Sequence, residues 1–209
     1  SGDSEDRARY EHHGRRSRNA RSIRKRHGAA CSPNPQGAII AAVEQSEGFP
    51  PVAGPDARVL VLGSLPGQRS IAEQQYYAHP QNAFWPIMCE LFGIRGDYGF
   101  RCQQLIGHRI AVWDVLACAI RAGSMDADIR LGGARANDFE EFLIAHPEIQ
   151  LIAFNGKKAE LLFERFVRLP AVHESIRCVG LPSTSPAYAA MSFSGKLLAW
   201  RQALQSVVT

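Results

Sequence analysis

Two neighbouring segments contain residue types that suit the binding of a flat, polar ring. The first is Gly63-Ser64-Leu65-Pro66-Gly67, and the second, from Tyr76 to Trp85, contains two tyrosines, an imidazole and the amide of Asn82. An apolar run at residues 58–62 comes directly before them and predicts a buried strand that ends in a Gly/Pro turn. Because ligands of open α/β sheets bind at the carboxyl ends of strands, we expect these side chains to line a ligand site.

Two later segments also place polar residues directly after an apolar run. Phe154-Asn155-Gly156-Lys157 is the first, and the run from Leu181 to Pro186 is the second. The carboxyl ends of parallel strands share one edge of a sheet, so all these clusters should converge on one cleft. Gly63 and Gly67 would let a ligand approach the backbone closely. The hydroxyl and N–H groups of the last segment suit phosphate oxygens, and they belong to Ser183, Thr184 and Ser185.

The elements that must position these residues follow from the hydrophobic pattern. Four short apolar runs alternate with amphipathic segments, which predicts a three-layer α/β/α sandwich around a four-stranded, mostly parallel sheet. Asn137 stands three residues before Glu140 and predicts a capping-box helix start. The expected strands are residues 58–62, 109–113, 149–154 and 176–181, and the expected helices are residues 37–46, 84–91, 137–145, 157–167 and 194–206.

Length and composition predict a soluble, intracellular protein with one folded domain over residues 36–209. The chain has 209 residues, 45% of them hydrophobic, and no apolar run approaches the ~20 residues that span a bilayer. No secretory signal is recognisable at the N-terminus. The five cysteines form no C-x-x-C pair, so we expect free thiols and no metal site.

Charge is concentrated near the N-terminus. Residues 1–30 carry nine Lys and Arg against four Asp and Glu, although the whole chain has a net charge of only +4. We expect residues 1–35 to be a basic, disordered tail. Such a tail either holds nucleic acid through non-specific phosphate contacts or is simply a solvated extension, and the sequence leaves both possibilities open.

Taken together, these motifs resemble those of the uracil-DNA glycosylase superfamily. Mismatch-specific thymine/uracil glycosylases have G-I-N-P-G, Y-x-x-P-x-N-x-F-W, F-N-G-K and M-P-S-S-S-A where this chain has residues 63–67, 77–85, 154–157 and 181–186. The resemblance covers about residues 56–207 and is greatest to the hypoxanthine-DNA glycosylase branch. That branch shares an apolar residue at Leu65, where the mismatch enzymes have an Asn that positions the attacking water. Since Leu65 can neither orient nor activate water, the resemblance implies that Asn82 supplies the catalytic amide.

The resemblance also implies roles for residues around Asn82. Tyr77 should stack on the extruded base, unless it is a half-buried structural residue, and Asn155 should hydrogen-bond the base edge, cap the following helix, or do both. Ser64 and Leu65 should contact the base from the first strand end. Mismatch enzymes insert an Arg after their serine run, but Ala187 is too small for this, so we expect Tyr188 to be the wedge. The expected DNA contacts are Gly67, Ser70, His79, Lys157, Ser183, Thr184, Ser185 and Tyr188.

Alternatives remain for several of these residues. His79 either contacts phosphate or the leaving base or is only a turn residue, and Lys157 and Lys158 are either phosphate contacts or a solvated helix start. Asp114 follows the second strand and invites a general-base role, although structural support is the simpler interpretation. Phe84 and Trp85 begin an amphipathic helix and should belong to the core.

These observations predict a monomeric, monofunctional DNA glycosylase of base excision repair that releases hypoxanthine from deoxyinosine and needs no cofactor. Its partner would be DNA with a deaminated base, in the nucleoid region of a bacterial cytoplasm or in a eukaryotic nucleus, with no membrane involved. Three alternatives stay open. The substrate base could be uracil or a mismatched pyrimidine, the chain could be a non-catalytic module that binds damaged DNA, or it could be a nucleotide-binding domain.

Overall fold

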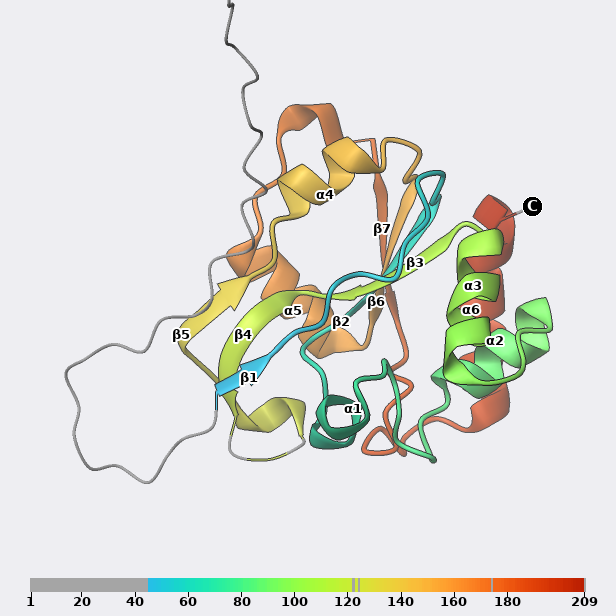
Figure 1. Cartoon of the computed structure of the whole chain (residues 1–209), viewed down its shortest axis with the longest axis horizontal. Helices are drawn as coiled ribbons and strands as arrows, with labels where there is room; N and C mark the ends of the chain where they lie inside the picture. The colour runs from blue at the N-terminus through green and yellow to red at the C-terminus, as the bar shows by residue number, and fades with distance from the viewer. Residues whose placement is uncertain (1–44, 122, 124, 174, 209) are drawn as a thin grey trace, which may run out of the picture. The chain divides into compact units, whose positions relative to one another are not determined.

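The computed structural model describes residues 45–208 except residues 122, 124 and 174 (Figure 1). The basic tail predicted for residues 1–35 lies outside the described residues, as does most of the helix predicted for residues 37–46. The last two residues of that prediction are wrong, because Gln45 and Ser46 belong to strand β1 (Gln45–Glu47), which pairs with another strand.

The central sheet has four parallel strands in the order β3-β2-β6-β7. These are β2 (Val59–Gly63), β3 (Ile110–Asp114), β6 (Leu151–Asn155) and β7 (Arg177–Leu181), and each falls within one or two residues of its predicted position. Strands β2, β3 and β6 are buried at every position, which explains why they are continuous apolar runs in the sequence. The predicted four-stranded α/β architecture is therefore confirmed.

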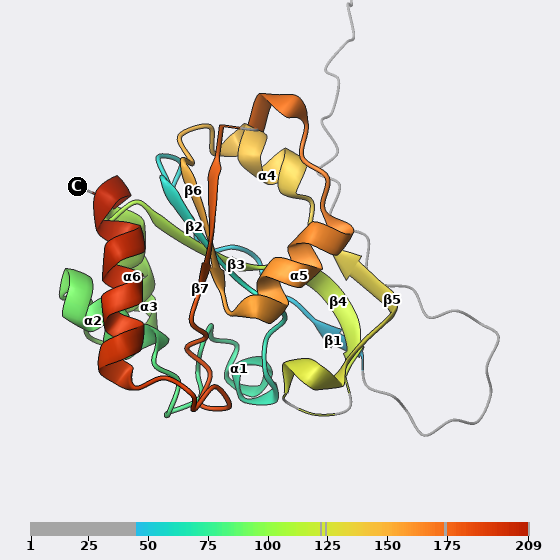
Figure 2. The same cartoon turned by 180° about the vertical axis from the view of Figure 1, so that it is seen from behind.

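Helices cover both faces of this sheet (Figure 2). Helices α2 (Phe84–Phe92), α3 (Tyr98–Gly107) and α6 (Phe193–Val208) lie on one face, and α4 (Phe139–Ala145) and α5 (Lys157–Phe166) lie on the other. Helix α3 and the short α1 (Gln68–Glu73) were not predicted. Helix α4 begins one residue later than its capping box suggested, because Asp138, and not Asn137, accepts the hydrogen bond from the Glu141 N–H.

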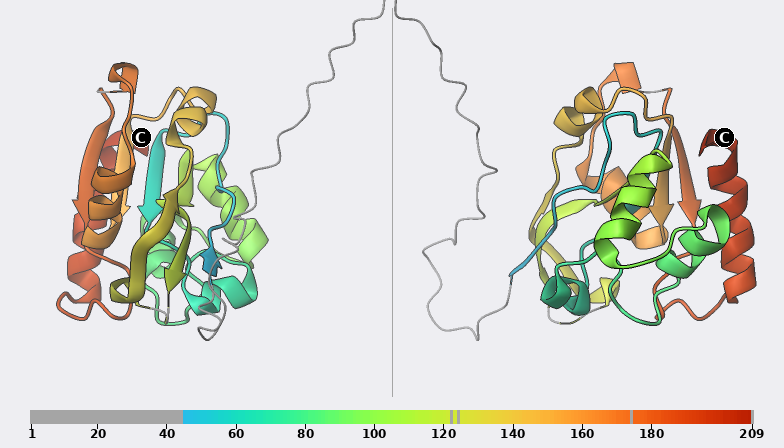
Figure 3. Two further views of the ribbon diagram at one scale, coloured as in Figure 1. Left: turned by 90° about the vertical axis from the view of Figure 1, so that its left-hand side faces the viewer. Right: turned by 45° about the vertical axis from the view of Figure 1, so that its right-hand side comes forward.

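A second, antiparallel sheet in the order β1-β4-β5 was also not predicted (Figure 3). It consists of β1, β4 (Leu116–Arg121) and β5 (Ile129–Ala136), and the turn η1 (Asp126–Asp128) leads into β5. A second short turn, η2 (Ala171–His173), precedes β7. Since a single residue separates the end of β3 from the start of β4, this sheet brings η1 toward the carboxyl end of the central strands.

Aromatic packing fixes the start of α2 beside that edge. Phe84 is fully buried and meets the ring of Trp200 of α6 edge-on, with 6.0 Å between ring centroids. The indole N–H of Trp85 donates to the carbonyl oxygen of Tyr76 at 2.9 Å. The prediction that Phe84 and Trp85 belong to the core is confirmed, and both anchor the segment that contains Tyr77 and Asn82.

Candidate active site

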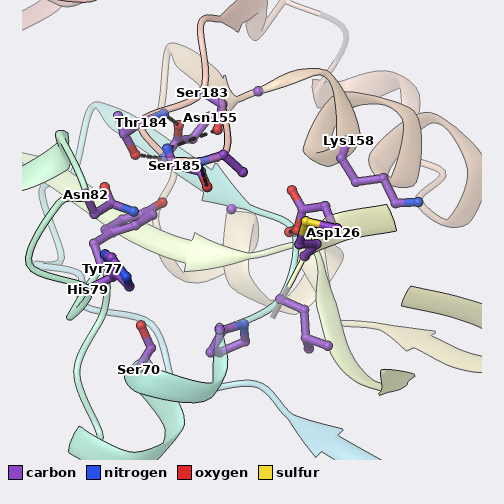
Figure 4. Close-up of a pocket in the computed structure, with 18 of the residues that line it drawn as sticks. Ser70, Tyr77, His79, Asn82, Asp126, Asn155, Lys158, Ser183, Thr184 and Ser185 are labelled. Carbon is purple, nitrogen blue, oxygen red and sulfur yellow. Dashed lines mark hydrogen bonds between the residues drawn. The ribbon is translucent and has the colours of Figure 1, made fainter. Parts of the chain in front are cut away.

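A pocket of about 520 Å³ lies at the carboxyl edge of the central sheet (Figure 4). Figure 4 shows Tyr77, His79 and Asn82 on one side of this pocket and Asp126 and Lys158 on the opposite side. The structure brings together in its lining every residue to which the sequence assigned a role, namely Ser64, Leu65, Gly67, Ser70, Tyr77, His79, Asn82, Asn155, Lys157, Ser183, Thr184, Ser185 and Tyr188.

The floor of the pocket is the place where three strands end side by side. Gly63 of β2 pairs with Asp114 of β3. On its other side β2 pairs with β6, where Leu62 is opposite Phe154, the residue before Asn155. A Cβ atom on Gly63 would lie 2.3 Å from Oδ1 of Asp114 and 3.4 Å from the Tyr77 hydroxyl. Glycine at this position therefore lets a buried carboxyl and a phenol occupy the space that a side chain would fill.

Asn155 uses both ends of its amide to hold the loop after β7. Its Oδ1 accepts from the Thr184 N–H at 2.8 Å, and its Nδ2 donates to the Thr184 hydroxyl at 2.8 Å. It does not cap α5: the N-cap residue is Gly156, at φ 98°, and the structure shows no side-chain cap among the described residues. Since an amide has two N–H groups and two lone pairs, one of each remains for a ligand.

Tyr77 combines a strained backbone with a buried hydroxyl. It is one of three described non-glycine residues with positive φ (56°), a conformation that persists only when its surroundings enforce it. Its ring stacks on Phe84 with 4.1 Å between centroids, so one face is covered. The hydroxyl has no hydrogen-bond partner among the described residues. Burial and then the charge of Asp114 raise the pKa of Tyr77, and the nearby Asn155 amide opposes this rise.

Asn82 is tied to the start of α2. Its Oδ1 accepts from the Phe84 N–H at 3.0 Å, and its own N–H donates to the His79 carbonyl at 2.8 Å. These bonds fix the amide at the pocket wall and leave its NH₂ group and a second oxygen lone pair for a ligand or water. His79 is exposed, and its Nδ1 accepts from the Gln81 N–H at 3.2 Å, as expected of a turn residue.

Asp114 is the most perturbed acid of the pocket. Its side chain lines the pocket, the residue is only 3% exposed, and Oδ2 has no hydrogen-bond partner among the described residues. Burial, and after it the charge of Asp126, raises the pKa of Asp114 to about 7, although the charge of Arg121 acts in the opposite direction. The sequence singled out this Asp because it follows a strand, but only the structure shows that its carboxyl faces a pocket without a partner.

Side chains from the second sheet hold the first motif in place. The Ser64 hydroxyl donates to Asp126, sixty-two residues away, and Arg121 donates to the carbonyl oxygens of Leu65 and Pro66. Asp126 therefore places a carboxylate next to the position where Leu65 replaces a polar residue. No local sequence signal connects the two segments, because β4 and η1 reach the site through long-range pairing.

The pocket rim combines hydroxyls, lysines and one exposed aromatic ring. Lys157 is paired with Glu160 at 2.8 Å, whereas no described ion pair involves Lys158. The Lys196 ammonium donates to the Tyr188 carbonyl at 2.8 Å and lies 5.2 Å from the centroid of its ring. Tyr188 is 38% exposed, and Met191 of the same loop and Phe193 at the start of α6 are also exposed, although the sequence did not single them out.

The described residues contain no group of three or more His, Cys, Asp or Glu side chains placed to hold a metal ion. Within the same part of the chain, no helix has the length and apolar character that crossing a membrane requires.

Comparisons with known proteins agree on one family. The model of the uracil DNA glycosylase superfamily matches residues 50–206. A hypoxanthine DNA glycosylase of Methanosarcina barkeri is 36% identical over 118 residues, which cover 55% of this chain and 73% of that protein. Its counterpart in Methanosarcina acetivorans is 38% identical over 115 residues, which cover 54% of this chain and 72% of the relative. Both are of moderate identity and match about half of this chain.

The fold is also similar to a solved structure. The solution NMR structure of a Methanosarcina acetivorans protein, provisionally assigned as a uracil DNA glycosylase, matches with a TM-score of 0.62 and 32% identity. The match covers 78% of this chain and 99% of that one.

Proposed function

Because this chain belongs to the uracil DNA glycosylase superfamily, we propose that it is a monofunctional DNA glycosylase that hydrolyses the N-glycosidic bond of deoxyinosine in DNA. The products would be free hypoxanthine and an abasic site. Two relatives named hypoxanthine DNA glycosylase support this choice of base. The observation that carries the proposal is the pocket itself, which places Tyr77, Asn82, Asn155 and Asp114 around one space at a strand edge.

The pocket has the size and chemistry that an extruded nucleotide requires. About 520 Å³ is within the range of small-molecule sites, and base-modifying enzymes take their base out of the stack into such a pocket. The free face of Tyr77 is available for stacking, worth about 1–3 kcal/mol per base in other proteins. The amide groups that Asn82 and Asn155 leave free can hydrogen-bond the edge of the base.

Cleavage of the glycosidic bond places positive charge on the sugar and negative charge on the departing base. Fixed donors that meet the departing base stabilise this charge separation, and a positioned water then adds to the sugar. Asn82 is suited to contact the base or this water, but an amide is not a strong base. We therefore expect slower turnover than in relatives with a carboxylate at the position of Leu65.

The rim supports DNA binding and a hydrolytic reaction. Ser183, Ser185 and Lys158 line the pocket on two sides and suit phosphate oxygens.

The lysine ammonium groups near the pocket are on its rim, and that of Lys157 is paired with Glu160. An enzyme that uses lysine as a nucleophile would need a free amine at the sugar. Tyr188 stays the proposed wedge, and a monomer stays the proposed state in solution.

Base release from two matched duplexes tests the proposal. One duplex carries a single deoxyinosine and the other a single deoxyuridine at the same position; free base is identified by chromatography, and abasic sites by strand cleavage after alkali. We expect hypoxanthine release with alkali-dependent cleavage. Asn82→Ala should slow it about 10²- to 10³-fold, the usual effect of removing one such donor. The control is Gln81→Ala, which removes an exposed neighbouring amide.

Other outcomes would change the proposal. Release of uracil alone would keep the mechanism and replace the base. Tight binding of deoxyinosine DNA without any release would mean that the chain is a damage-binding module. Strand cleavage without alkali would show that the reaction is not purely hydrolytic.

A further inference from the structure

Two buried polar groups beside Gly63 lack hydrogen-bond partners. Oδ2 of Asp114 has none among the described residues, and the hydroxyl of Tyr77 has none of good geometry, although the Asn155 side chain lies beside it; both residues line the pocket. A Cβ atom on Gly63 would approach both side chains, so they flank the same small space. Buried polar groups in folded proteins are nearly always bonded, and leaving one unbonded destabilises the fold. A ligand that enters this space would supply the missing bonds.

Burial, and after it the charge of Asp126, favours the neutral form of Asp114. Asp126 of η1, Arg121 of β4 and the phenols of Tyr76 and Tyr77 face it from the neighbouring elements. Burial and Asp126 raise the pKa of Asp114, and Arg121 opposes them. The NH1 and NH2 groups of Arg121 donate to the carbonyl oxygens of Leu65 and Pro66, so its attraction for Asp114 acts without a direct hydrogen bond. Close to neutral pH, a substantial fraction of Asp114 therefore carries a proton.

We propose that Asp114 is a further catalytic residue of the proposed glycosylase: its carboxyl contacts the extruded purine and donates a proton to a ring nitrogen as the base departs. Hypoxanthine has unprotonated ring nitrogens at N3 and N7, away from the N9 atom that binds the sugar. Uracil has no such ring nitrogen, since its N3 carries hydrogen and its other acceptors are carbonyl oxygens. An acid in this place therefore favours a purine over a pyrimidine.

Water is the only other reactant that this hydrolysis needs, and its protons and electrons balance. The C1′–N9 bond breaks, and its electron pair leaves with the purine. The Asp114 proton moves to N3 or N7, so the base departs neutral. Water adds to C1′ and loses one proton, which returns the carboxylate to its acid form directly or through solvent. The sum is hydrolysis of the glycosidic bond.

Single-turnover kinetics of Asp114→Asn test the proposal, with deoxyinosine DNA as substrate between pH 5 and 9. Wild-type protein should release hypoxanthine at a constant rate below about pH 7 and tenfold more slowly for each pH unit above it. Asp114→Asn should be 10²- to 10⁴-fold slower at pH 6, the usual contribution of a general acid, and should lose this decline. Equal rates and equal pH profiles in the two proteins would overturn the proposal.

Base analogues test the same contact in the wild-type protein, without any risk of misfolding. Duplexes with 7-deazadeoxyinosine and 3-deazadeoxyinosine each lack one of the two ring nitrogens. One of them should be processed at least tenfold more slowly by wild-type protein, and Asp114→Asn should slow that analogue no further. If wild-type protein releases both analogues as fast as hypoxanthine, the proposal is wrong. Failure of wild-type protein to release hypoxanthine at all would instead overturn the proposed function.

Discussion

Asp114 and Asn155 stand on opposite sides of Gly63, and their surroundings differ sharply. Each is the last residue of a buried strand, and they are 3% and 8% exposed. Asn155 has both ends of its amide bonded to Thr184. Asp114 has an oxygen without a partner among the described residues, and burial raises its pKa to about 7.

This difference gives the two residues of the pocket floor separate roles: Asn155 positions a loop, and Asp114 takes part in the reaction. A buried amide with satisfied bonds rigidifies the loop that carries Ser183, Thr184 and Ser185. A buried acid without a partner destabilises the fold, and such unsatisfied groups occur mainly at functional sites, where a ligand contacts them. We therefore expect substitutions on the Asn155 side to act mainly on stability and loop position, in addition to the loss of its contact with the base. Substitutions on the Asp114 side should act mainly on the reaction, with a smaller effect on stability that depends on pH.

Gly63→Ala should slow the reaction strongly, because it displaces the Asp114 carboxyl directly. The new methyl would lie 2.3 Å from Oδ1 of Asp114, which is buried and has little room to move. We expect single-turnover release of hypoxanthine to fall more than 100-fold, since even small displacements of catalytic groups reduce rates this much. Gly107→Ala is the control, because its methyl would meet nothing within 4 Å. A Gly63→Ala protein with wild-type rates would show that the space is not used.

Asn155→Leu should mainly reduce stability. It removes two buried hydrogen bonds and leaves the Thr184 N–H without a partner, so we expect a loss of about 2–4 kcal/mol in the free energy of unfolding. Thr184→Val removes only the bond from Asn155 Nδ2 and should cost about 1 kcal/mol. Urea denaturation measures both values. Equal, negligible losses would mean that the Thr184 bonds do not hold the loop.

Asp114→Asn should stabilise the protein at high pH. Because the folded pKa of Asp114 is raised, the folded state binds more protons than the unfolded state between pH 4 and 7, and wild-type stability falls over that interval. A tenfold difference in proton affinity between the two states corresponds to about 1.4 kcal/mol. Asparagine still buries an amide, which offsets part of this gain. We therefore expect the free energy of unfolding to rise by about 2 kcal/mol at pH 8 and by little at pH 4. Denaturation at several pH values measures this, and a gain that does not change with pH would contradict it.

Lys158→Ala should have the smallest effect, because Lys158 lies on the pocket rim. If it contacts phosphate, affinity for damaged and undamaged duplexes should fall by the same few-fold factor. The slope of log affinity against log salt should decrease by about 1. Lys157→Ala should do less, since that ammonium is paired with Glu160. Fluorescence anisotropy at several salt concentrations measures these slopes, and loss of discrimination between the two duplexes would instead indicate contact with the base.

The sequence predicts the central sheet and the residues that line the pocket, but not the electrostatics of the pocket. Strands such as β6 are recognisable because burial on both faces makes them apolar throughout. Strand β5 is not, since it contains two glycines and two arginines and depends on pairing with β4. The Ser64–Asp126 bond and the missing partner of Asp114 depend on this long-range pairing and on the register beside Gly63. Periodicity in a single chain contains no information about either.

Direct titration of the Asp114 carboxyl is the most decisive measurement. Carbon-13 NMR of the full chain, with the resonance assigned by its absence in Asp114→Asn, reports the protonation of this group without any substrate. We predict a midpoint close to pH 7, and a shift to lower pH in Asp126→Asn, because the Asp126 charge raises the pKa of Asp114. A midpoint near pH 4 would show that Asp114 is ionised at neutral pH and would contradict its role as an acid.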